Sequence, residues 1–321
     1  MRSVLTLLEE GRFVSGEAIS RTLGVSRAAV WKQIAALREE GWQIESGGKR
    51  GYRLLAGDRL DPALWTGTLT TKTLGRGENR CLPEADSTNN VVKRMALAGA
   101  PGGSLCIAET QTAGKGRLGR AWCSPAGRGL WVSVLLRPQL PPERAPLLTL
   151  CAALAMAQAV RETAGLDVKI KWPNDLVYQG RKLCGILLEI GADPDAIEYV
   201  VVGTGLNVLD GAYPPELAER AAAVAEFTAP PPRRTILVHY LAALEALVDR
   251  LEREGFEGIA AAYQAGSCTL GSRVSVSGSV ALTGVAEAID DSGALLVRTE
   301  DGTLHRVLSG DVSVRGVMGY A

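Results

Sequence analysis

The sequence predicts a protein of the α+β class in three parts, and three observations carry this prediction. Residues 1–58 contain helix-like runs that end in a glycine-rich hairpin. Residues 61–266 alternate helix-like and strand-like runs, which is typical of a domain built on one sheet. Residues 267–321 contain short strands between turn signals, which predicts a small all-β barrel.

The composition is that of a globular protein, with 46% hydrophobic and 22% charged residues. No apolar run reaches the ~18 residues that span a bilayer, and Glu9 and Glu10 interrupt the first apolar run. We therefore expect a cytoplasmic protein with no membrane contact. The six cysteines form no CxxC pair and the chain has two histidines, which disfavours zinc and iron–sulfur sites and predicts core thiols in a reducing compartment.

The first 58 residues have the pattern of a winged helix-turn-helix. A helix over 16–23 is followed by a turn at Gly24, and Ser26 is a good N-cap for the next helix. Strand-like runs at 42–45 and 52–55 enclose a glycine-rich turn with two cations at its tip.

The next helix buries Val30, Ile34 and Leu37 on one face, so its opposite face predicts contact with DNA. Small residues beside cations let a helix enter the ~12 Å wide major groove, and cations on the wing suit phosphates. The residues predicted to bind DNA are Arg27, Ala28, Trp31, Lys32, Lys49 and Arg50.

A single head of this size reads one half-site, so we expect a homodimer on a palindromic operator. The alternative is a protein-interaction module with a solvated polar face. Residues 1–55 carry nine cationic and six acidic side chains, which is a small excess for a DNA-binding protein.

Residues 114–120, Gly-Lys-Gly-Arg-Leu-Gly-Arg, form a glycine-rich segment that we call the glycine loop. It matches GxGxxG literally, but a strand-like run follows instead of the helix that a dinucleotide site requires. Its backbone amides and three cations predict a loop that wraps an anion and becomes ordered on binding. The alternative is an exposed turn with solvated charges.

Two segments further along the chain also indicate a binding site. Pro173 ends a strand that carries Lys169 and Lys171 on one face, which places the Asp175 carboxylate at the sheet edge, where it could serve Mg²⁺. We expect this strand to pair as a hairpin with the strand that starts at Lys182, which would bring Asp175 and Lys182 together. The two groups form either a structural ion pair or a site for a carboxylate and the developing phosphoryl charge.

Two more segments are less specific. The run 203–207 could approach a nucleotide closely, and residues 210–232, rich in Pro and Ala, suggest a mobile flap or a surface excursion.

Taken together and in order, segments 114–120, 171–175, 181–185 and 203–207 resemble those of the bifunctional biotin–protein ligase and biotin operon repressor family. Residues 86–89 match that family's biotin-binding segment, and Ser15–Glu17 and Ser26–Ala29 match its head. The resemblance covers nearly the whole chain. It implies a central domain related in fold to class II aminoacyl-tRNA synthetases and an SH3-like C-terminal barrel.

The resemblance implies a reaction in two steps. Biotin and ATP give biotinyl-5′-AMP and pyrophosphate, and the biotinyl group then passes to a lysine of the biotin carboxyl carrier protein, a subunit of acetyl-CoA carboxylase. ATP and Mg²⁺ are the implied cofactors. The other implied partners are operator DNA and a second copy of the chain, and the implied regulatory role is repression of biotin synthesis genes.

The same resemblance implies roles for individual residues. The implied catalytic residues are Lys182, Arg117 and Asp175, with Asp175 serving Mg²⁺ or orienting the attacking lysine. Biotin binding falls to Ser87, Thr88, Asn89, Gln111, Lys115, Gly116, Arg117 and Lys182. ATP binding falls to Arg117, Arg120, Trp122, Lys171 and Asn207. The chief departure is Lys115, where the family usually has arginine; the change is mild if the backbone binds, and costly if a bidentate phosphate contact matters.

Two alternatives stay open. A lipoate-type acyl ligase performs the same class of reaction on a longer apolar acid. A biotin-sensing transcription factor would bind biotin without catalysis, although the set of Lys182, Asp175 and Arg117 argues against lost catalysis.

Overall fold

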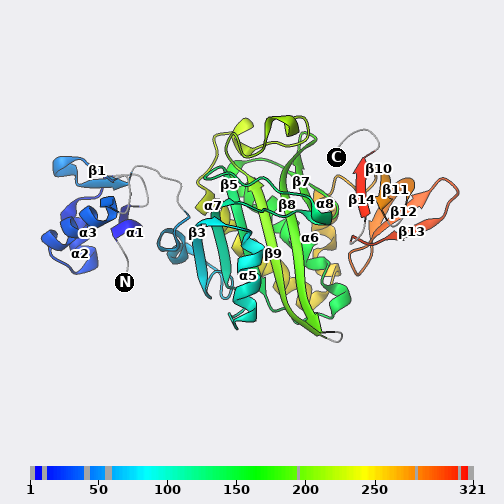
Figure 1. The fold of residues 1–321 in the computed structure, drawn as a ribbon, viewed down its shortest axis with the longest axis horizontal. Helices are drawn as coiled ribbons and strands as arrows, with labels where there is room; N and C mark the ends of the chain where they lie inside the picture. The colour runs from blue at the N-terminus through cyan, green and yellow to red at the C-terminus, as the bar shows by residue number, and fades with distance from the viewer. Residues whose placement is uncertain are drawn as a thin grey trace. The chain divides into compact units, whose positions relative to one another are not determined.

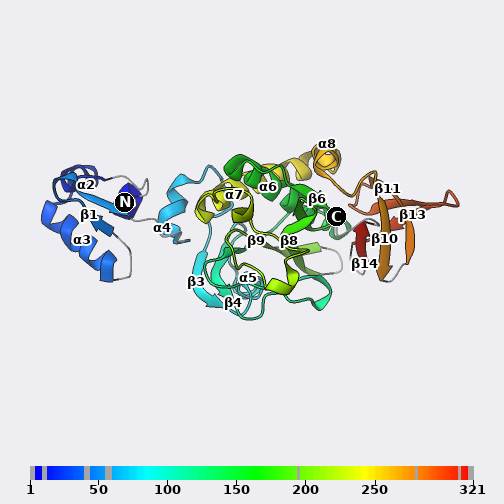
Figure 2. The ribbon, with the colours of Figure 1, turned by 90° about the horizontal axis from the view of Figure 1, so that it is seen from above.

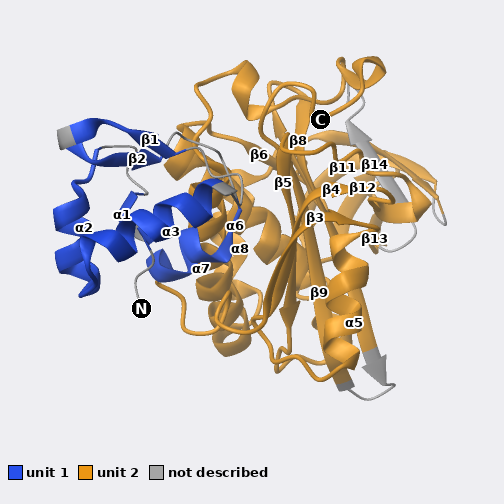
Figure 3. Cartoon of the chain, turned by 60° about the vertical axis from the view of Figure 1, so that its left-hand side comes forward, with its two compact units in different colours: residues 1–69 blue, residues 70–321 orange. Residues whose placement is uncertain are grey.

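The computed structural model describes residues 4–8, 13–39, 44–54, 60–193, 196–278, 281–309 and 312–316. The chain divides into two compact units, residues 1–69 and 70–321 (Figure 3). The predicted boundaries at 58–61 and 266–267 stay predictions. The first unit includes a short helix after residue 61, and the second includes the sheets on both sides of residue 266.

The first unit is a helical head with a two-stranded wing. Its elements are α1 (Val4–Leu8), α2 (Gly16–Leu23), α3 (Arg27–Glu39), β1 (Ile44–Ser46), β2 (Tyr52–Leu54) and α4 (Pro62–Trp65) (Figure 1). Local capping sets the helix boundaries. The Ser15 hydroxyl accepts a hydrogen bond from the Ala18 amide at 3.1 Å, and Gly24 ends α2 in the left-handed region at φ 68°.

The predicted faces of α3 are confirmed. Ser26 caps this helix by accepting from the Ala29 amide at 3.2 Å. Val30 and Ile34 lie in the core of the head with Leu64 of α4, and Leu37 packs against them. The opposite face of α3 is therefore exposed.

The second unit is built on a mixed sheet of seven strands in the order β3-β4-β5-β9-β8-β7-β6. β3 and β4 pair in parallel and the other neighbours are antiparallel. The strands are β3 (Asn79–Ala85), β4 (Leu105–Gln111), β5 (Gly129–Leu136), β6 (Lys169–Lys171), β7 (Asp175–Tyr178), β8 (Arg181–Asp193) and β9 (Ala196–Asn207). This mixed sheet confirms the predicted α+β class.

Helices cover both faces of this sheet (Figures 1 and 2). α5 (Thr88–Leu97) lies on one face, and α6 (Leu147–Ala164), α7 (Arg233–Glu254) and α8 (Glu257–Gly266) lie on the other side. Among the described residues one helix, 142–164, is long and apolar enough to cross a membrane, and 61% of its most apolar window is buried in the protein. That burial is the behaviour of a core helix.

The C-terminal part is an antiparallel sheet of five strands in the order β13-β12-β11-β10-β14, as predicted for a small all-β domain. Its strands are β10 (Arg273–Gly278), β11 (Leu282–Ile289), β12 (Leu295–Thr299), β13 (Leu304–Val307) and β14 (Val312–Gly316). The Trp172 indole donates to the Gly293 carbonyl at 3.1 Å. This bond ties the C-terminal sheet to the end of β6.

One prediction about the sheet is wrong. The strand ending near Trp172 does not pair directly with the strand that starts at Lys182. The short strand β7 lies between them, pairs with both, and aligns Asp175 with Gly185 and Val177 with Lys182. The chain makes two tight turns within about 13 residues, a pattern that a search for one hairpin does not detect.

Candidate active site

A cavity of about 840 Å³ lies over β8 and β9 and is bordered by the glycine loop, the N-terminus of α5 and the β6–β7 turn. Every residue predicted to act on biotin or ATP lines it: Ser87, Thr88, Asn89, Gln111, Lys115, Gly116, Arg117, Arg120, Trp122, Lys171, Asp175, Lys182 and Asn207. Folding therefore gathers segments that are up to 120 residues apart in the sequence around one space.

Glycines on β8 and β9 make room for one wall of this cavity. A Cβ on Gly205 would lie 2.5 Å from the Trp122 indole nitrogen, and one on Gly185 would lie 2.9 Å from the same ring. Trp131 supports Trp122 from the side, edge to face, with 6.4 Å between the ring centroids. Trp122 thus forms a flat apolar wall of the cavity.

Cations dominate the lining of the cavity although the whole chain has no net charge. The charged lining residues are Lys115, Arg117, Arg120, Lys171, Lys182 and Arg220 against Asp175 and Glu219. Burial lowers the pKa of the Arg117 guanidinium, and Lys171 is 6% exposed. A cavity with this excess of positive charge favours an anionic ligand such as a carboxylate or a nucleoside triphosphate.

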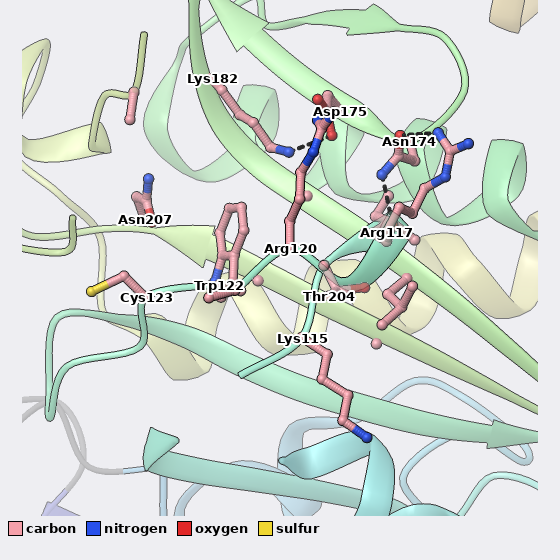
Figure 4. Close-up of a pocket in the computed structure, with 18 of the residues that line it drawn as sticks. Lys115, Arg117, Arg120, Trp122, Cys123, Asn174, Asp175, Lys182, Thr204 and Asn207 are labelled. Carbon is pink, nitrogen blue, oxygen red and sulfur yellow. Dashed lines mark hydrogen bonds and ion pairs between the residues drawn. The ribbon is translucent and has the colours of Figure 1, made fainter. Parts of the chain in front are cut away.

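Lys182 and Asp175 meet inside the cavity, as predicted (Figure 4). The Lys182 ammonium lies 2.6 Å from an Asp175 carboxylate oxygen and 5.1 Å from the centroid of the Trp122 ring. The ammonium retains donors for a ligand after pairing with one carboxylate, because it carries three hydrogens.

The glycine loop is fastened at its Arg117 end. The Arg117 guanidinium donates to the Asn174 side-chain oxygen at 3.1 Å and to the backbone carbonyl of Ser309 in the C-terminal part. One side chain thus links the loop, the β6–β7 turn and the C-terminal domain.

Lys115, where the family usually has arginine, points away from Lys182 and Asp175 (Figure 4). The Asp86 carboxylate accepts the Asn90 amide N–H at 2.7 Å, and this hydrogen bond lowers the pKa of Asp86 to about 2. The Asn90 oxygen is then left to accept from the Lys115 ammonium at 2.9 Å. The charge of Lys115 therefore ties the glycine loop to α5.

If the cavity binds biotin and ATP, as the resemblance implies, we expect Lys115→Met to raise the KM for biotin by a few-fold and to leave the KM for ATP unchanged, because one exposed hydrogen bond of about 1 kcal/mol is lost and no phosphate contact is removed. Steady-state kinetics with each substrate varied in turn measures this, with Lys72→Met, an exposed lysine outside the cavity, as the control. A rise in the KM for ATP alone would show that the Lys115 side chain binds phosphate.

Residues 210–232, which we call the cap segment, form part of the site that the sequence did not predict. The Lys182 amide donates to the Arg220 carbonyl at 2.7 Å, and the Asn207 side chain donates to the Ala222 carbonyl at 3.0 Å. The Tyr213 hydroxyl and Arg181 both bind Glu226. Tyr213 and Arg220 line the cavity, but no periodicity or motif in this Pro/Ala-rich segment marks them.

The cysteine prediction needs one correction. All six thiols are free, and burial raises the pKa of Cys106 and Cys151 to about 12. Cys123, however, is exposed at the cavity, and Cys81 and Cys268 are only partly buried, so these three are not core thiols. Cys123 follows Trp122, whose ring occupies the space against the sheet.

The predicted DNA-binding residues of α3, namely Arg27, Ala28, Trp31 and Lys32, are all exposed, and Trp31 is 60% exposed. On the wing, the Arg50 guanidinium stacks over Phe13 with 4.1 Å to the ring centroid. The side chain of Lys49 lies outside the described residues.

A mixed sheet with a cation-rich cavity, a glycine loop that borders it and a helix-turn-helix head define a class of protein: an acid-activating ligase with a DNA-binding domain. Residues 82–207 match the Biotin/lipoate A/B protein ligase family, residues 1–53 an HTH domain, and residues 269–315 the biotin protein ligase C terminal domain.

Similar proteins of full length make the assignment specific. The chain is 35% identical over 311 residues to the bifunctional ligase/repressor BirA of Bacillus subtilis, which covers 94% of both chains. It is 32% identical over 317 residues to BirA of Escherichia coli, covering 97% of this chain and 96% of that protein. The chain belongs to the family of bifunctional biotin ligase/repressors.

The fold agrees with solved structures. The biotin protein ligase of Aquifex aeolicus in complex with biotin and ATP superposes with a TM-score of 0.65 at 30% identity, covering 74% of this chain and 99% of that one.

Proposed function

We propose that this chain is a cytoplasmic protein that forms biotinyl-5′-AMP from biotin and ATP in its cavity and transfers the biotinyl group to a lysine of the biotin carboxyl carrier protein. We also propose that it represses biotin synthesis genes. One observation carries the enzymatic proposal. Lys182, Asp175 and Arg117 line the same cavity as Thr88 and Gln111, which are hydrogen-bonded to each other. The charged residues suit the carboxylate of an acid, and the polar pair suits a polar ring at the other end of the same molecule.

In the first step the ring of biotin is bound by Ser87, Thr88 and Gln111, and its carboxylate lies at the Lys182 ammonium. A carboxylate oxygen attacks the α-phosphorus of ATP, and the bond from this phosphorus to the bridging oxygen of pyrophosphate breaks. Lys182, with Arg117 and Arg120, offsets the negative charge that develops at phosphorus. The partly buried position of Arg117 makes this charge more effective, because water screens it less.

In the second step the amine of the carrier lysine attacks the acyl carbon of the adenylate, an amide bond forms, and AMP leaves. The nucleophile must lose a proton, and Asp175, 2.6 Å from Lys182, is the acidic group placed to orient it. The acyl phosphate must be shielded from water until the carrier arrives, and we assign this task to the glycine loop and the cap segment.

For adenine we propose the end of the cavity formed by Trp122 and Asn207. Asn207 is 2% exposed and its amide nitrogen already binds Ala222 of the cap segment, so it supports this end of the site as well as facing it. The apolar face of Trp122 suits a base or the rim of the biotin ring.

The residues present fit Mg²⁺ that arrives with the nucleotide. Among the described residues there is no group of three or more His, Cys, Asp or Glu side chains that could hold a metal ion. Mg²⁺ commonly binds one or two carboxylates together with substrate phosphates and water, and Asp175, one of the two carboxylates that line the cavity, would hold it. The ion would supply charge neutralisation at the phosphates.

A fixed-time assay with biotin, ATP-Mg²⁺ and a carrier domain tests the enzymatic proposal. Biotin on the carrier is the expected result. Transfer of lipoate in preference to biotin would support the lipoate-type alternative, and biotin binding without any transfer would support a sensor that has lost catalysis.

The repressor role rests on the exposed face of α3 and on the stacked Arg50 of the wing. We expect operator affinity to fall steeply with salt, by on the order of 10-fold or more between 50 and 200 mM if about two to three phosphates are contacted per head. An electrophoretic or fluorescence titration over a salt series measures this. A flat salt dependence would support the protein-interaction alternative.

We also propose that binding of the adenylate promotes a homodimer, which binds the operator. Sedimentation with and without biotin and ATP-Mg²⁺ tests this, and the expected result is a shift towards the dimer. If no shift occurs, ligand-dependent dimerisation is wrong.

A further inference from the structure

A continuous row of hydrogen-bonding groups connects residues that line the cavity with residues buried behind them. The Asn89 amide nitrogen donates to Glu189 at 2.7 Å, and the Asn89 oxygen lies 2.6 Å from the Ser133 hydroxyl. That hydroxyl lies 2.7 Å from the Thr88 hydroxyl, which lies 3.1 Å from the Gln111 side-chain oxygen. Thr88, Asn89 and Gln111 line the cavity, whereas Ser133 and Glu189 do not.

The Glu189 carboxylate determines which atoms of this row donate hydrogen bonds and which accept them. One Glu189 oxygen pairs with the Lys93 ammonium and the other accepts from Asn89. A carboxylate accepts hydrogen bonds and donates none, so the Asn89 amide must turn its nitrogen to Glu189 and its oxygen to Ser133. The carbonyl of Leu187, 3.5 Å from the same nitrogen, favours this orientation as well.

The hydrogens in the rest of the row can be counted. Four oxygens, those of Asn89, Ser133, Thr88 and Gln111, make three successive contacts, and the two hydroxyls supply two hydrogens between them. The Ser133 hydrogen goes to Asn89 and the Thr88 hydrogen goes to Ser133, because these contacts are the shortest. The Gln111 oxygen is supplied instead by the Thr88 backbone N–H at 2.8 Å.

It follows that the Thr88 hydroxyl has no hydrogen left for a ligand and offers a lone pair. Ser133 is fully buried and Thr88 and Asn89 are 4% and 3% exposed, so bulk water cannot easily reorganise the row. In so buried a network a donor facing a donor, or an acceptor facing an acceptor, is costly.

We propose that Ser133 and Glu189 are positioning residues that hold Thr88 as a hydrogen-bond acceptor, so that the cavity selects an acid whose ring presents N–H donors. This inference rests on the proposed function and deepens it, because it assigns the preference for a cyclic urea to residues that do not touch the substrate. A dithiolane ring has no N–H group and leaves the Thr88 hydroxyl oxygen without a donor.

The substitution Glu189→Gln tests the proposal with little change of shape. The Lys93 ammonium can only donate, so the introduced glutamine turns its oxygen to Lys93 and its NH₂ group to Asn89. Asn89 must then reverse, donating to Ser133, which donates to Thr88 in turn. The Thr88 oxygen loses the orientation that accepts from the ring.

We expect Glu189→Gln to raise the KM for biotin about 10-fold, the worth of one hydrogen bond of ~1.4 kcal/mol, with less than about a 2-fold change in kcat and in the KM for ATP. The cyclic carbonate analogue of biotin has oxygen in place of both ring N–H groups. The ratio of kcat/KM for biotin to kcat/KM for this analogue should fall by a similar factor. Ser133→Ala, which removes the group that takes the Thr88 hydrogen, should lower the same ratio.

Two further variants distinguish an effect of hydrogen-bond direction from a general disruption of the cavity. Lys93→Met alone leaves the Glu189 carboxylate as an acceptor and should behave as wild type. In the double variant Lys93→Met/Glu189→Gln the glutamine is free to turn its oxygen to Asn89, so the KM for biotin and the preference over the carbonate should largely recover.

The inference is wrong if wild type ligates biotin but Glu189→Gln and Ser133→Ala keep its preference for biotin over the carbonate analogue. It is also wrong if the double variant does not recover that preference. Equal rises in the KM for biotin and ATP would overturn it too, since they indicate general disruption of the cavity. Failure of the proposed function is distinguishable, because the wild-type chain would then not biotinylate the carrier at all.

Discussion

Lys182→Ala is expected to slow formation of biotinyl-5′-AMP by on the order of 10²–10³-fold, the effect of removing one group that stabilises developing charge. The Lys182 ammonium is the cation that faces Asp175 at 2.6 Å and stands over Trp122 in the cavity. The cap segment holds its backbone through bonds to Arg220 and Ala222. The methyl group of alanine leaves both the biotin carboxylate and the α-phosphate without this partner.

Biotin-dependent exchange of labelled pyrophosphate into ATP measures this step in isolation from transfer. Lys169→Ala is the matched control, because the Lys169 ammonium pairs with the exposed Asp167 at 2.7 Å and its side chain does not line the cavity. Near-normal exchange in Lys182→Ala, with a normal melting temperature, would remove Lys182 from the role assigned to it.

Arg117→Gly is expected to release the adenylate about 10–100-fold faster, because charge-assisted hydrogen bonds contribute about 1.5–3 kcal/mol and each 1.4 kcal/mol is a factor of ten. Arg117 links the glycine loop to Asn174 and to the Ser309 carbonyl. Without these bonds the loop remains attached at Lys115, so the site still forms but opens more readily.

Dissociation of preformed adenylate from single-turnover mixtures measures the effect, and biotin appearing on a bystander protein is its consequence. Leu118→Gly is the matched control. It places the new glycine at φ 57°, a conformation that glycine adopts without strain, and leaves Arg117 in place. Unchanged adenylate release from Arg117→Gly would count against the glycine loop as a gate.

Much of this protein is encoded locally and could be predicted. The N-cap Ser26, the turn at Gly24 and the spacing of Val30 and Ile34 specify the head because each acts within one or two helical turns. The residues predicted to act on biotin or ATP also line one cavity, since they lie in short segments whose residue types suit an anion and a polar ring.

Contacts between distant segments could not be predicted in the same way. β7 is four residues long and has no turn or periodic signal strong enough to separate it from its neighbours. Tyr213 and Arg220 reach the cavity because the cap segment bonds to the start of β8, about 40 residues away. The exposure of Cys123 depends on Trp122, whose ring needs the space above Gly185 and Gly205.

The sequence by itself determined the order of the elements and the chemistry of the side chains in the site, because helix caps, turns and alternation are short-range effects. Only the tertiary structure decided where those side chains point and whether they donate or accept hydrogen bonds. Lys115 turns to Asn90, and Thr88 is held as an acceptor by Ser133 and Glu189, which lie 45 and 101 residues further along the chain. The direction of a buried hydrogen bond depends on every donor and acceptor that folding brings next to it, and those neighbours come from distant parts of the chain.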